Sequence, residues 1–133
     1  MVSANNLKQY THMYSSRPDV SQMTLDIIEA IKTNQTVQFM YGGQDGIREA
    51  HPDKFFGDFE LFGGNLTNWD NDDSYRKFRL DKIDEWLGIP IQYKVYVELD
   101  MSGYPTDKEV TEKLHELLDS AEPVVYRLKP KGL

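Results

Sequence analysis

The sequence predicts an α+β protein in which a helix precedes a small, strongly bent antiparallel β-barrel and a strand–helix–strand unit follows it. Hydrophobic residues recur at helical spacing after Ser21. After Asn34 the spacing changes to alternation in short runs divided by glycine-rich turns. The length of 133 residues suits one domain, or a small domain with an appendage.

We divide the chain into three parts: a polar N-terminal arm over 1–20, a helix and barrel over 21–88, and an extension over 89–133. The helix is predicted to begin near Ser21 and to stop at Asn34. Its buried face combines the hydrophobic side chains Met23, Ile27, Ile28 and Ile31. Pro52 indicates an edge or a bulge in the second strand, and Gly57-Asp58 indicates a hairpin turn. The four barrel strands are predicted at 36–41, 47–56, 59–64 and 74–80.

The extension is predicted to begin with the clearest strand in the sequence, residues 91–99. Its apolar side chains alternate on one face: Ile91, Tyr93, Val95, Val97 and Leu99. Thr106 with Glu109 forms a capping-box pattern, so a helix should start there. Residues 124–128 form the last predicted strand, and residues 84–90 are the best candidate for a junction between barrel and extension.

Composition excludes several classes of protein. Without cysteine there is no disulfide, no thiolate catalysis and no Cys-based metal site. The N-terminus lacks an apolar signal-peptide region and no run of 18 apolar residues occurs, so we expect a cytoplasmic protein without a membrane span. A net charge of −7 argues against broad electrostatic binding of nucleic acid. The acidic loop around Asp70, Asp72 and Asp73 lacks the glycine and the glutamate of a calcium-binding loop.

One stretch departs from this acidic character, because residues 74–83 contain four basic side chains and a single acid. In a strand, Phe78 and Leu80 would face the core, while Tyr75, Lys77 and Arg79 would share the open face. Arginine offers a planar fork to phosphate oxygens, and an aromatic ring offers a stacking surface to a base. The alternative is a solvated strand whose basic side chains pair with the acids of residues 70–73.

Residues 25–83 resemble a WYL domain, a family named for a Trp-Tyr-Leu signature in bacterial regulators. The resemblance depends on the order and spacing of several weak motifs rather than on any single one. In chain order these are "EAI" with Ala30, the strand-ending Tyr41, Gly46, Arg48, Pro52, "GDFELFG" at 57–63 and "RKFRLDKI" at 76–83. The last motif is the most specific.

Two departures from the family pattern affect the expected function. The signature is here Phe59, Glu60 and Leu61, so a charge replaces the family's tyrosine, and Glu60 could pair with Arg76 or Arg48. Family regulators usually carry a winged helix-turn-helix before the domain. Because only twenty residues precede Ser21, we expect that this chain is not a complete DNA-binding repressor.

The resemblance implies an SH3-like (Sm-type) barrel that acts as a sensing or binding module in transcriptional regulators, phage-defence proteins and some helicases. We therefore predict a regulator without catalytic activity or cofactor, which binds a nucleotide, a single-stranded oligonucleotide or another phosphate-bearing ligand. The alternative is an adaptor that binds a protein partner or a second copy, with no nucleic-acid ligand. The predicted ligand-binding residues are Arg79, Lys77, Tyr75, Arg48 and Tyr41.

Overall fold

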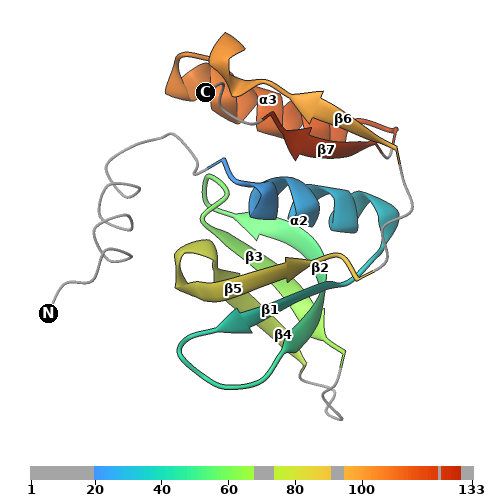
Figure 1. Ribbon diagram of the computed structural model, residues 1–133, viewed down its shortest axis with the longest axis vertical. Helices are drawn as coiled ribbons and strands as arrows, with labels where there is room; N and C mark the ends of the chain where they lie inside the picture. Colours follow the sequence, from blue (N-terminus) through green and yellow to red (C-terminus); the bar gives the residue numbers. More distant parts are fainter. Residues whose placement is uncertain (1–19, 68–73, 91–94, 123, 130–133) are drawn as a thin grey trace, which may run out of the picture.

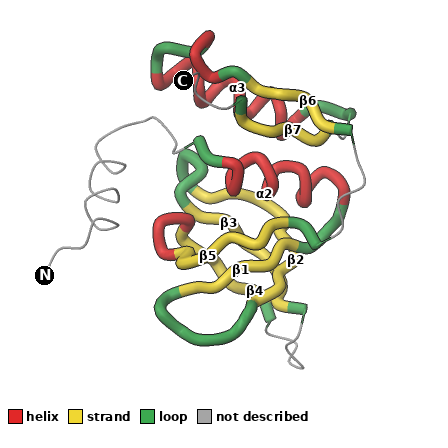
Figure 2. Tube along the Cα trace, viewed as in Figure 1, coloured by secondary structure: helices red, strands yellow, loops and turns green. Residues whose placement is uncertain are grey.

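The structure is a computed structural model that describes residues 20–67, 74–90, 95–122 and 124–129. In this part of the chain it has the predicted mixed α+β architecture, with a five-stranded antiparallel sheet, a two-stranded parallel sheet and two α-helices (Figures 1 and 2). The elements are α2 (Gln22–Thr33), β1 (Val37–Tyr41), β2 (Arg48–Phe56), β3 (Leu61–Leu66), β4 (Tyr75–Arg79), η1 (Leu80–Lys82), β5 (Ile83–Gly88), β6 (Tyr96–Leu99), η2 (Met101–Gly103), α3 (Asp107–Asp119) and β7 (Val125–Leu128).

Helix α2 begins and ends at the residues that the sequence predicts. The Ser21 side chain caps the N-terminus by accepting a hydrogen bond from the backbone N–H of Thr24 at 3.4 Å. Asn34 ends the helix in the left-handed region, at φ 57°, which asparagine tolerates better than most residues. Local capping chemistry therefore fixes both ends.

The large sheet has the strand order β4-β3-β2-β1-β5, so β4 and β5 are its two edges. These edge strands are joined in sequence by the single 3-10 turn η1. Within the described residues β4 and β5 form no ladder, so the predicted barrel is not closed by strand pairing. A side-chain contact links β4 to β1 instead, because the backbone N–H of Arg79 donates to Tyr41 Oη at 3.0 Å. The N–H of Gly42 donates to the Lys82 carbonyl at 3.1 Å and extends the pairing of β1 with β5 into η1.

Strand β5 occupies residues that the sequence analysis assigned to a junction. It pairs with β1 along its length, but the register shifts twice, between Gln38 and Phe39 and again between Met40 and Tyr41. Each irregularity moves the buried positions out of simple alternation. Sequence periodicity therefore does not reveal this strand.

The third strand is shifted by two residues from its predicted bounds, because the hairpin turn extends over residues 57–60. Phe59 lies in this turn with φ 66°, an uncommon conformation for a bulky side chain. Its ring is buried, 4.7 Å from the Phe55 ring and 5.0 Å from the His115 ring of α3, measured between centroids. The turn thus connects the sheet to the C-terminal helix.

The C-terminal unit pairs β6 with β7 in parallel and packs both strands with α3. The predicted capping box is present at the start of α3, where Thr106 and Glu109 exchange hydrogen bonds of 3.2 Å. The buried face predicted for residues 91–99 is only partly confirmed. Leu99 is buried, but Val95 and Val97 are exposed, and residues 91–94 lie outside the described part.

Helix α2 is the middle layer of the molecule, with the five-stranded sheet on one side and the β6–β7 sheet with α3 on the other (Figure 1). Two hydrophobic clusters meet it. The first joins α2 to the large sheet through Ile27, Ala30, Val37, Phe39, Ala50, Phe62, Leu66, Phe78 and Ile89. The second joins α2 to the C-terminal unit through Leu25, Ile28, Phe59, Leu99, Val110, Leu114 and Leu117.

Polar side chains of α2 also connect the two layers. Asp26 accepts hydrogen bonds from Trp86 Nε1 of β5 at 2.8 Å and from Gln22 Nε2 at 3.0 Å. The Gln22 amide in turn bonds the edge of β7, donating to the Tyr126 carbonyl at 2.8 Å and accepting from the Leu128 N–H at 2.9 Å. In the described part of the chain, the helices are too short and too polar to cross a bilayer.

The environment of Asp26 favours its protonated form. Burial raises the pKa of this carboxyl above its ordinary value, against the opposing effects of the hydrogen bonds from Trp86 and Gln22 and of the Arg127 charge. Because the folded state binds this proton more tightly than the unfolded state, the protonated Asp26 carboxyl adds to the free energy of unfolding. This contribution is fully present below the unfolded-state pKa of 3.8 and is lost as pH rises through the folded-state pKa.

We therefore predict that the free energy of unfolding of the wild type, relative to Asp26→Asn, decreases as pH rises from about 3 to about 7. Urea unfolding at a series of pH values measures this difference. Asp58→Asn, on the exposed hairpin turn, is the matched control and should follow the wild type. The prediction would be contradicted if the free energies of unfolding of the wild type and of Asp26→Asn differed by the same amount at every pH in this range.

Candidate functional site

The candidate site lies on the side of β2, β3 and β4 that faces away from the first hydrophobic cluster. Phe62 and Phe78 are register partners and both are buried, so their chain neighbours Gly63 and Lys77 face outward. Gly63 is also the register partner of Lys54 on β2. We call this surface the β2–β4 outer face and define it by Lys54, Phe56, Gly63, Tyr75, Lys77 and Arg79.

A bulge in β2 places two of these residues on the outer face. Ala50 and Pro52 are buried, so unbroken alternation would also turn positions 54 and 56 inward. The register shift between Pro52 and Lys54 reverses this order. Lys54 and Phe56 consequently point outward, and Phe55 packs against the core.

The centre of the outer face is an aromatic ring with two lysines. Lys77 Nζ lies 4.2 Å from the centroid of the Phe56 ring, and Lys54 Nζ lies 5.1 Å from it. Exposed cation–π contacts of this kind contribute about 0.5–1 kcal/mol each. Among the described residues no carboxylate lies within ion-pair distance of either ammonium group. Within the part of the chain that the structure describes, two positive charges therefore meet at one ring without a carboxylate in ion-pair contact.

Gly63 makes this arrangement possible, because side chains from both neighbouring strands lie over it. A Cβ atom at this position would lie 2.0 Å from Tyr75 Oη and 2.7 Å from Phe56 Cε2. A Cβ atom essentially never lies this close to a non-bonded heavy atom, so any larger residue would displace the two rings. Because glycine has no side chain, the rings of Tyr75 and Phe56 fill the space beside position 63 of β3.

Tyr75 is held by an acid on β2. Its hydroxyl donates a hydrogen bond of 2.8 Å to Asp53 Oδ1. Burial, together with this hydrogen bond and the Asp53 charge, raises the pKa of Tyr75 to about 12. The phenol is therefore a stable hydrogen-bond donor at neutral pH, and that donor is already used within the protein.

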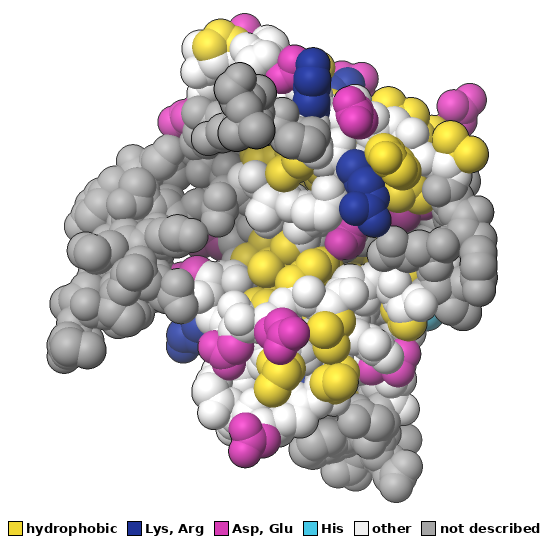
Figure 3. Space-filling model, in the orientation of Figure 1, with side chains coloured by type: hydrophobic (Ala, Val, Ile, Leu, Met, Phe, Trp, Pro, Cys, Tyr) yellow, Lys and Arg dark blue, Asp and Glu magenta, His cyan; other side chains and the backbone are white. Residues whose placement is uncertain are grey.

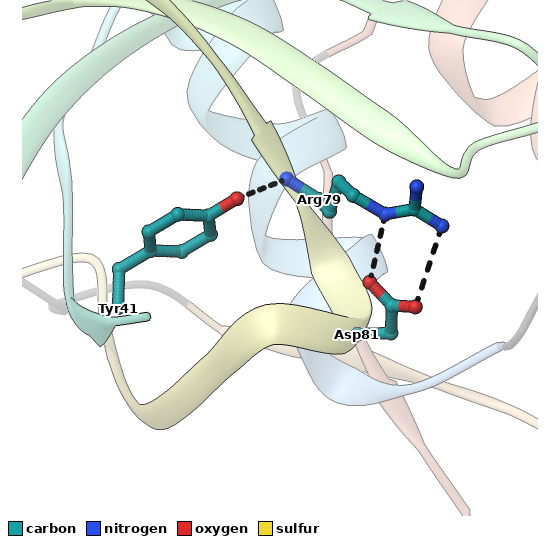
Figure 4. A network of polar contacts seen from close by, with 3 residues as sticks. All are labelled: Tyr41, Arg79 and Asp81. Carbon is teal, nitrogen blue, oxygen red and sulfur yellow. Dashed lines mark hydrogen bonds and ion pairs between the residues drawn. The ribbon is translucent and has the colours of Figure 1, made fainter. Parts of the chain in front are cut away.

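Arg79 is held by two contacts that point in different directions (Figure 4). Its guanidinium forms a forked pair with Asp81, with Nε 3.2 Å from Oδ1 and Nη2 3.5 Å from Oδ2. Its backbone N–H donates to Tyr41 Oη on the other side of the strand. Part of the positive charge on β4 is thus compensated inside the protein.

The other two predicted ligand-binding residues lie elsewhere. Arg48 is the register partner of the buried Phe39 and lies near the turn between β1 and β2. Its guanidinium lies 5.6 Å from the centroid of the Tyr41 ring and donates to Gln44 Oε1. Tyr41 itself packs edge-on against Phe39 and Phe78. Of the five predicted residues, the structure brings Tyr75, Lys77 and Arg79 onto one face, whereas Arg48 and Tyr41 form a separate pair.

Sequence reasoning missed Lys54 and Phe56, although Pro52 was recognised as a possible bulge. Because a bulge reverses which face the following residues point to, a bulge at Pro52 places both residues on the outer face. The predicted pairing of basic side chains with Asp70, Asp72 and Asp73 falls on residues outside the described part. Within residues 20–67, 74–90, 95–122 and 124–129, no group of three potential ligands could hold a metal ion.

Comparisons with known proteins do not add to this picture. No protein-family model matches the chain, and no curated protein or solved structure is significantly similar to it.

The Tyr75–Asp53 contact leads to a prediction in alkaline titration. Subtracting the phenolate absorbance of Tyr75→Phe from that of the wild type should isolate a step at a pKa of about 12. Asp53→Asn removes the charge and should lower this pKa, though not fully to 10, because burial remains its largest cause. The control Asp58→Asn should leave the step unchanged. If Asp53→Asn and Asp58→Asn changed the pKa of Tyr75 equally, Asp53 would have no specific effect on Tyr75.

The crowding at Gly63 leads to a prediction for stability. Gly63→Ala should lower the free energy of unfolding by about 1–3 kcal/mol, because the rings of Tyr75 and Phe56 must move. Gly103→Ala is the matched control, since an added Cβ there meets nothing within 4 Å, and it should change stability by less than about 0.5 kcal/mol. Chemical denaturation of the three proteins measures both effects, and equal values for the two variants would refute the crowding argument.

Proposed function

We propose that this chain is a non-catalytic ligand-binding module of the WYL type, with an SH3-like (Sm-type) barrel that binds a phosphate-bearing ligand on the β2–β4 outer face. The ligand class is a nucleotide or a short single-stranded nucleic acid, and its binding regulates a partner. The observation that carries the proposal is the pair of lysines at the exposed side of the Phe56 ring.

The chemistry of this group suits a base next to a phosphate. A base stacks on an aromatic ring with about 1–3 kcal/mol, whatever its identity. Lys54 and Lys77 approach the same ring, so their ammonium groups can reach phosphate oxygens beside a stacked base. A ligand on this ring would gain both interactions from β2 and β4, the two strands that flank β3 in one sheet.

The distribution of charge favours a small ligand over a long nucleic acid. On the face shown in Figure 3, acidic side chains are scattered among hydrophobic and uncharged ones, and Lys and Arg side chains are few. With a net charge of −7, a polyanion that extended beyond the basic face would meet repulsion. The proposal is therefore limited to a ligand about as large as the face itself.

The contacts divide the face into ligand-binding and supporting residues. Lys54, Lys77 and Phe56 are the contact residues. Tyr75 supports the ring from the position over Gly63, with its hydroxyl bound to Asp53. Arg79 has a smaller role than its charge suggests, because Asp81 already occupies its fork.

The strand arrangement supports the SH3-like part of the proposal. The five strands run antiparallel, and the two edges β4 and β5 are joined by one 3-10 turn. Such a short connection requires the sheet to curl until its edges approach each other. A sheet bent in this way supports the strongly bent, small barrel that we propose from the WYL resemblance.

Fluorescence anisotropy with short labelled single-stranded RNA and DNA, and competition by mononucleotides, tests the proposal. Lys54→Ala with Lys77→Ala should abolish binding or weaken it strongly. Each lysine that contacts a phosphate should also contribute about 0.7 to the slope of log affinity against log salt concentration. Lys108→Ala with Lys129→Ala changes the net charge equally on a different surface and is the matched control.

Phe56→Leu separates stacking from charge. It keeps an apolar side chain but should reduce affinity by about 1–3 kcal/mol for each stacked base, with the salt slope unchanged. Equal affinity of the wild type and the Lys54/Lys77 double variant for all of these probes would refute the proposal.

A further inference from the structure

Four side chains on the outer side of β1 and β5 form a second surface, which we call the Glu85 patch. They are Met40 of β1, Ile47 just before β2, and Glu85 and Leu87 of β5. Ile47 is 55% exposed and Leu87 is 42% exposed. Single exposed hydrophobic side chains are ordinary, but a contiguous group of them indicates an interaction surface.

The pairing of β1 with β5 brings three of these side chains together. Phe39 and its register partner Trp86 stack on each other and pack in the first hydrophobic cluster. The next pair, Met40 with Glu85, therefore points outward. Leu87 lies two positions beyond Glu85 on the same side of β5.

Ile47 completes the patch from the start of β2. Arg48 is the register partner of Phe39, so Ile47 lies next to Met40 where the ladder between β1 and β2 ends. In Figure 3, hydrophobic side chains gather over β1 and β5 with acidic side chains beside them. The patch is thus continuous across neighbouring strands.

The charge of this surface is negative. Glu85 is exposed among the hydrophobic side chains, and Asp45 is exposed in the turn that leads to them. In the described part of the chain, neither carboxylate has a Lys or Arg side chain within ion-pair distance. A third acid, Asp84, accepts a hydrogen bond of 2.7 Å from the Gly43 N–H, which ties the turn to β5. Hydrophobic contact area and negative charge therefore occur together.

We propose that the Glu85 patch binds a protein partner through a segment in which hydrophobic side chains are combined with lysine or arginine. The partner's hydrophobic side chains pack on Met40, Ile47 and Leu87, and one of its cations pairs with Glu85. Complementary charge at such a contact selects the partner and steers its approach. The patch shares no residue with the β2–β4 outer face, so the inference does not depend on the proposed ligand.

The charge of the patch distinguishes this partner from other occupants. A membrane surface carries anionic lipids and attracts basic residues, so it would repel these carboxylates. A second copy could offer the cations of its β2–β4 outer face, but a contact between two unlike patches continues from copy to copy into rings or filaments. A separate protein with a basic, hydrophobic segment meets the charge requirement without such growth.

Isothermal titration calorimetry with short synthetic peptides tests the proposal. A peptide of alternating lysine and leucine should bind the wild type. Glu85→Lys should weaken this binding about tenfold and make the variant prefer a peptide of alternating glutamate and leucine, because the charge is reversed. Ile47→Ser with Leu87→Ser should weaken binding of the lysine–leucine peptide about tenfold through lost hydrophobic contact, with the charge unchanged.

Glu112→Lys makes the same charge change on the exposed side of α3 and is the matched control, so it should bind the lysine–leucine peptide as the wild type does. Because the substituted side chains are exposed, the variants should fold, and circular dichroism checks this. The proposal is overturned if the lysine–leucine peptide fails to bind the wild type, or binds the wild type, Glu85→Lys and the Ile47/Leu87 double variant equally.

Sedimentation velocity over a concentration series decides between a separate partner and a second copy. The wild type should show no association that depends on Glu85. Larger species that grow with the concentration of the wild type, and that Glu85→Lys removes, would assign the patch to another copy of this chain and overturn the proposal.

Discussion

The two-sided burial of α2 is the constraint on which the rest of this structure depends. Ile27 and Ala30 belong to the cluster with the five-stranded sheet, whereas Leu25 and Ile28 belong to the cluster with the C-terminal unit. A helix with a single apolar face could cover only one of these. Because apolar side chains occur on both sides of α2, neither the large sheet nor the β6–β7 sheet needs a helix of its own at this position.

Local chemistry allowed several elements to be predicted, and long-range pairing limited the others. The ends of α2 and the start of α3 follow from Ser21, Asn34 and Thr106, whose capping contacts involve near neighbours in the chain. Strand β5 could not be recognised, because its pattern depends on two register shifts against β1. The place of Phe59 was also unpredictable, because its burial requires contact with α3, more than forty residues further along the chain.

The candidate site shows the same division. The alternation within β4 correctly separated Phe78 from Tyr75, Lys77 and Arg79, because a regular strand fixes its own two faces. The ring at the centre of the face comes from β2, where the bulge reverses the alternation. The use of Arg79 by Asp81 depends on the 3-10 turn after β4, and the strand pattern gives no sign of that turn. One strand was thus enough to predict the face, but the cluster around Phe56 depends on the pairing of β2, β3 and β4.

The Gln22 side chain has a consequence for how far a sheet can extend. Its amide bonds both the Tyr126 carbonyl and the Leu128 N–H, and so takes the place that a neighbouring strand would have beside β7. The edge of β7 beside α2 is therefore closed to a further strand. One glutamine thus shields one edge of the small parallel sheet from the open-ended, fibre-like addition of strands, which is the usual danger of an uncovered edge.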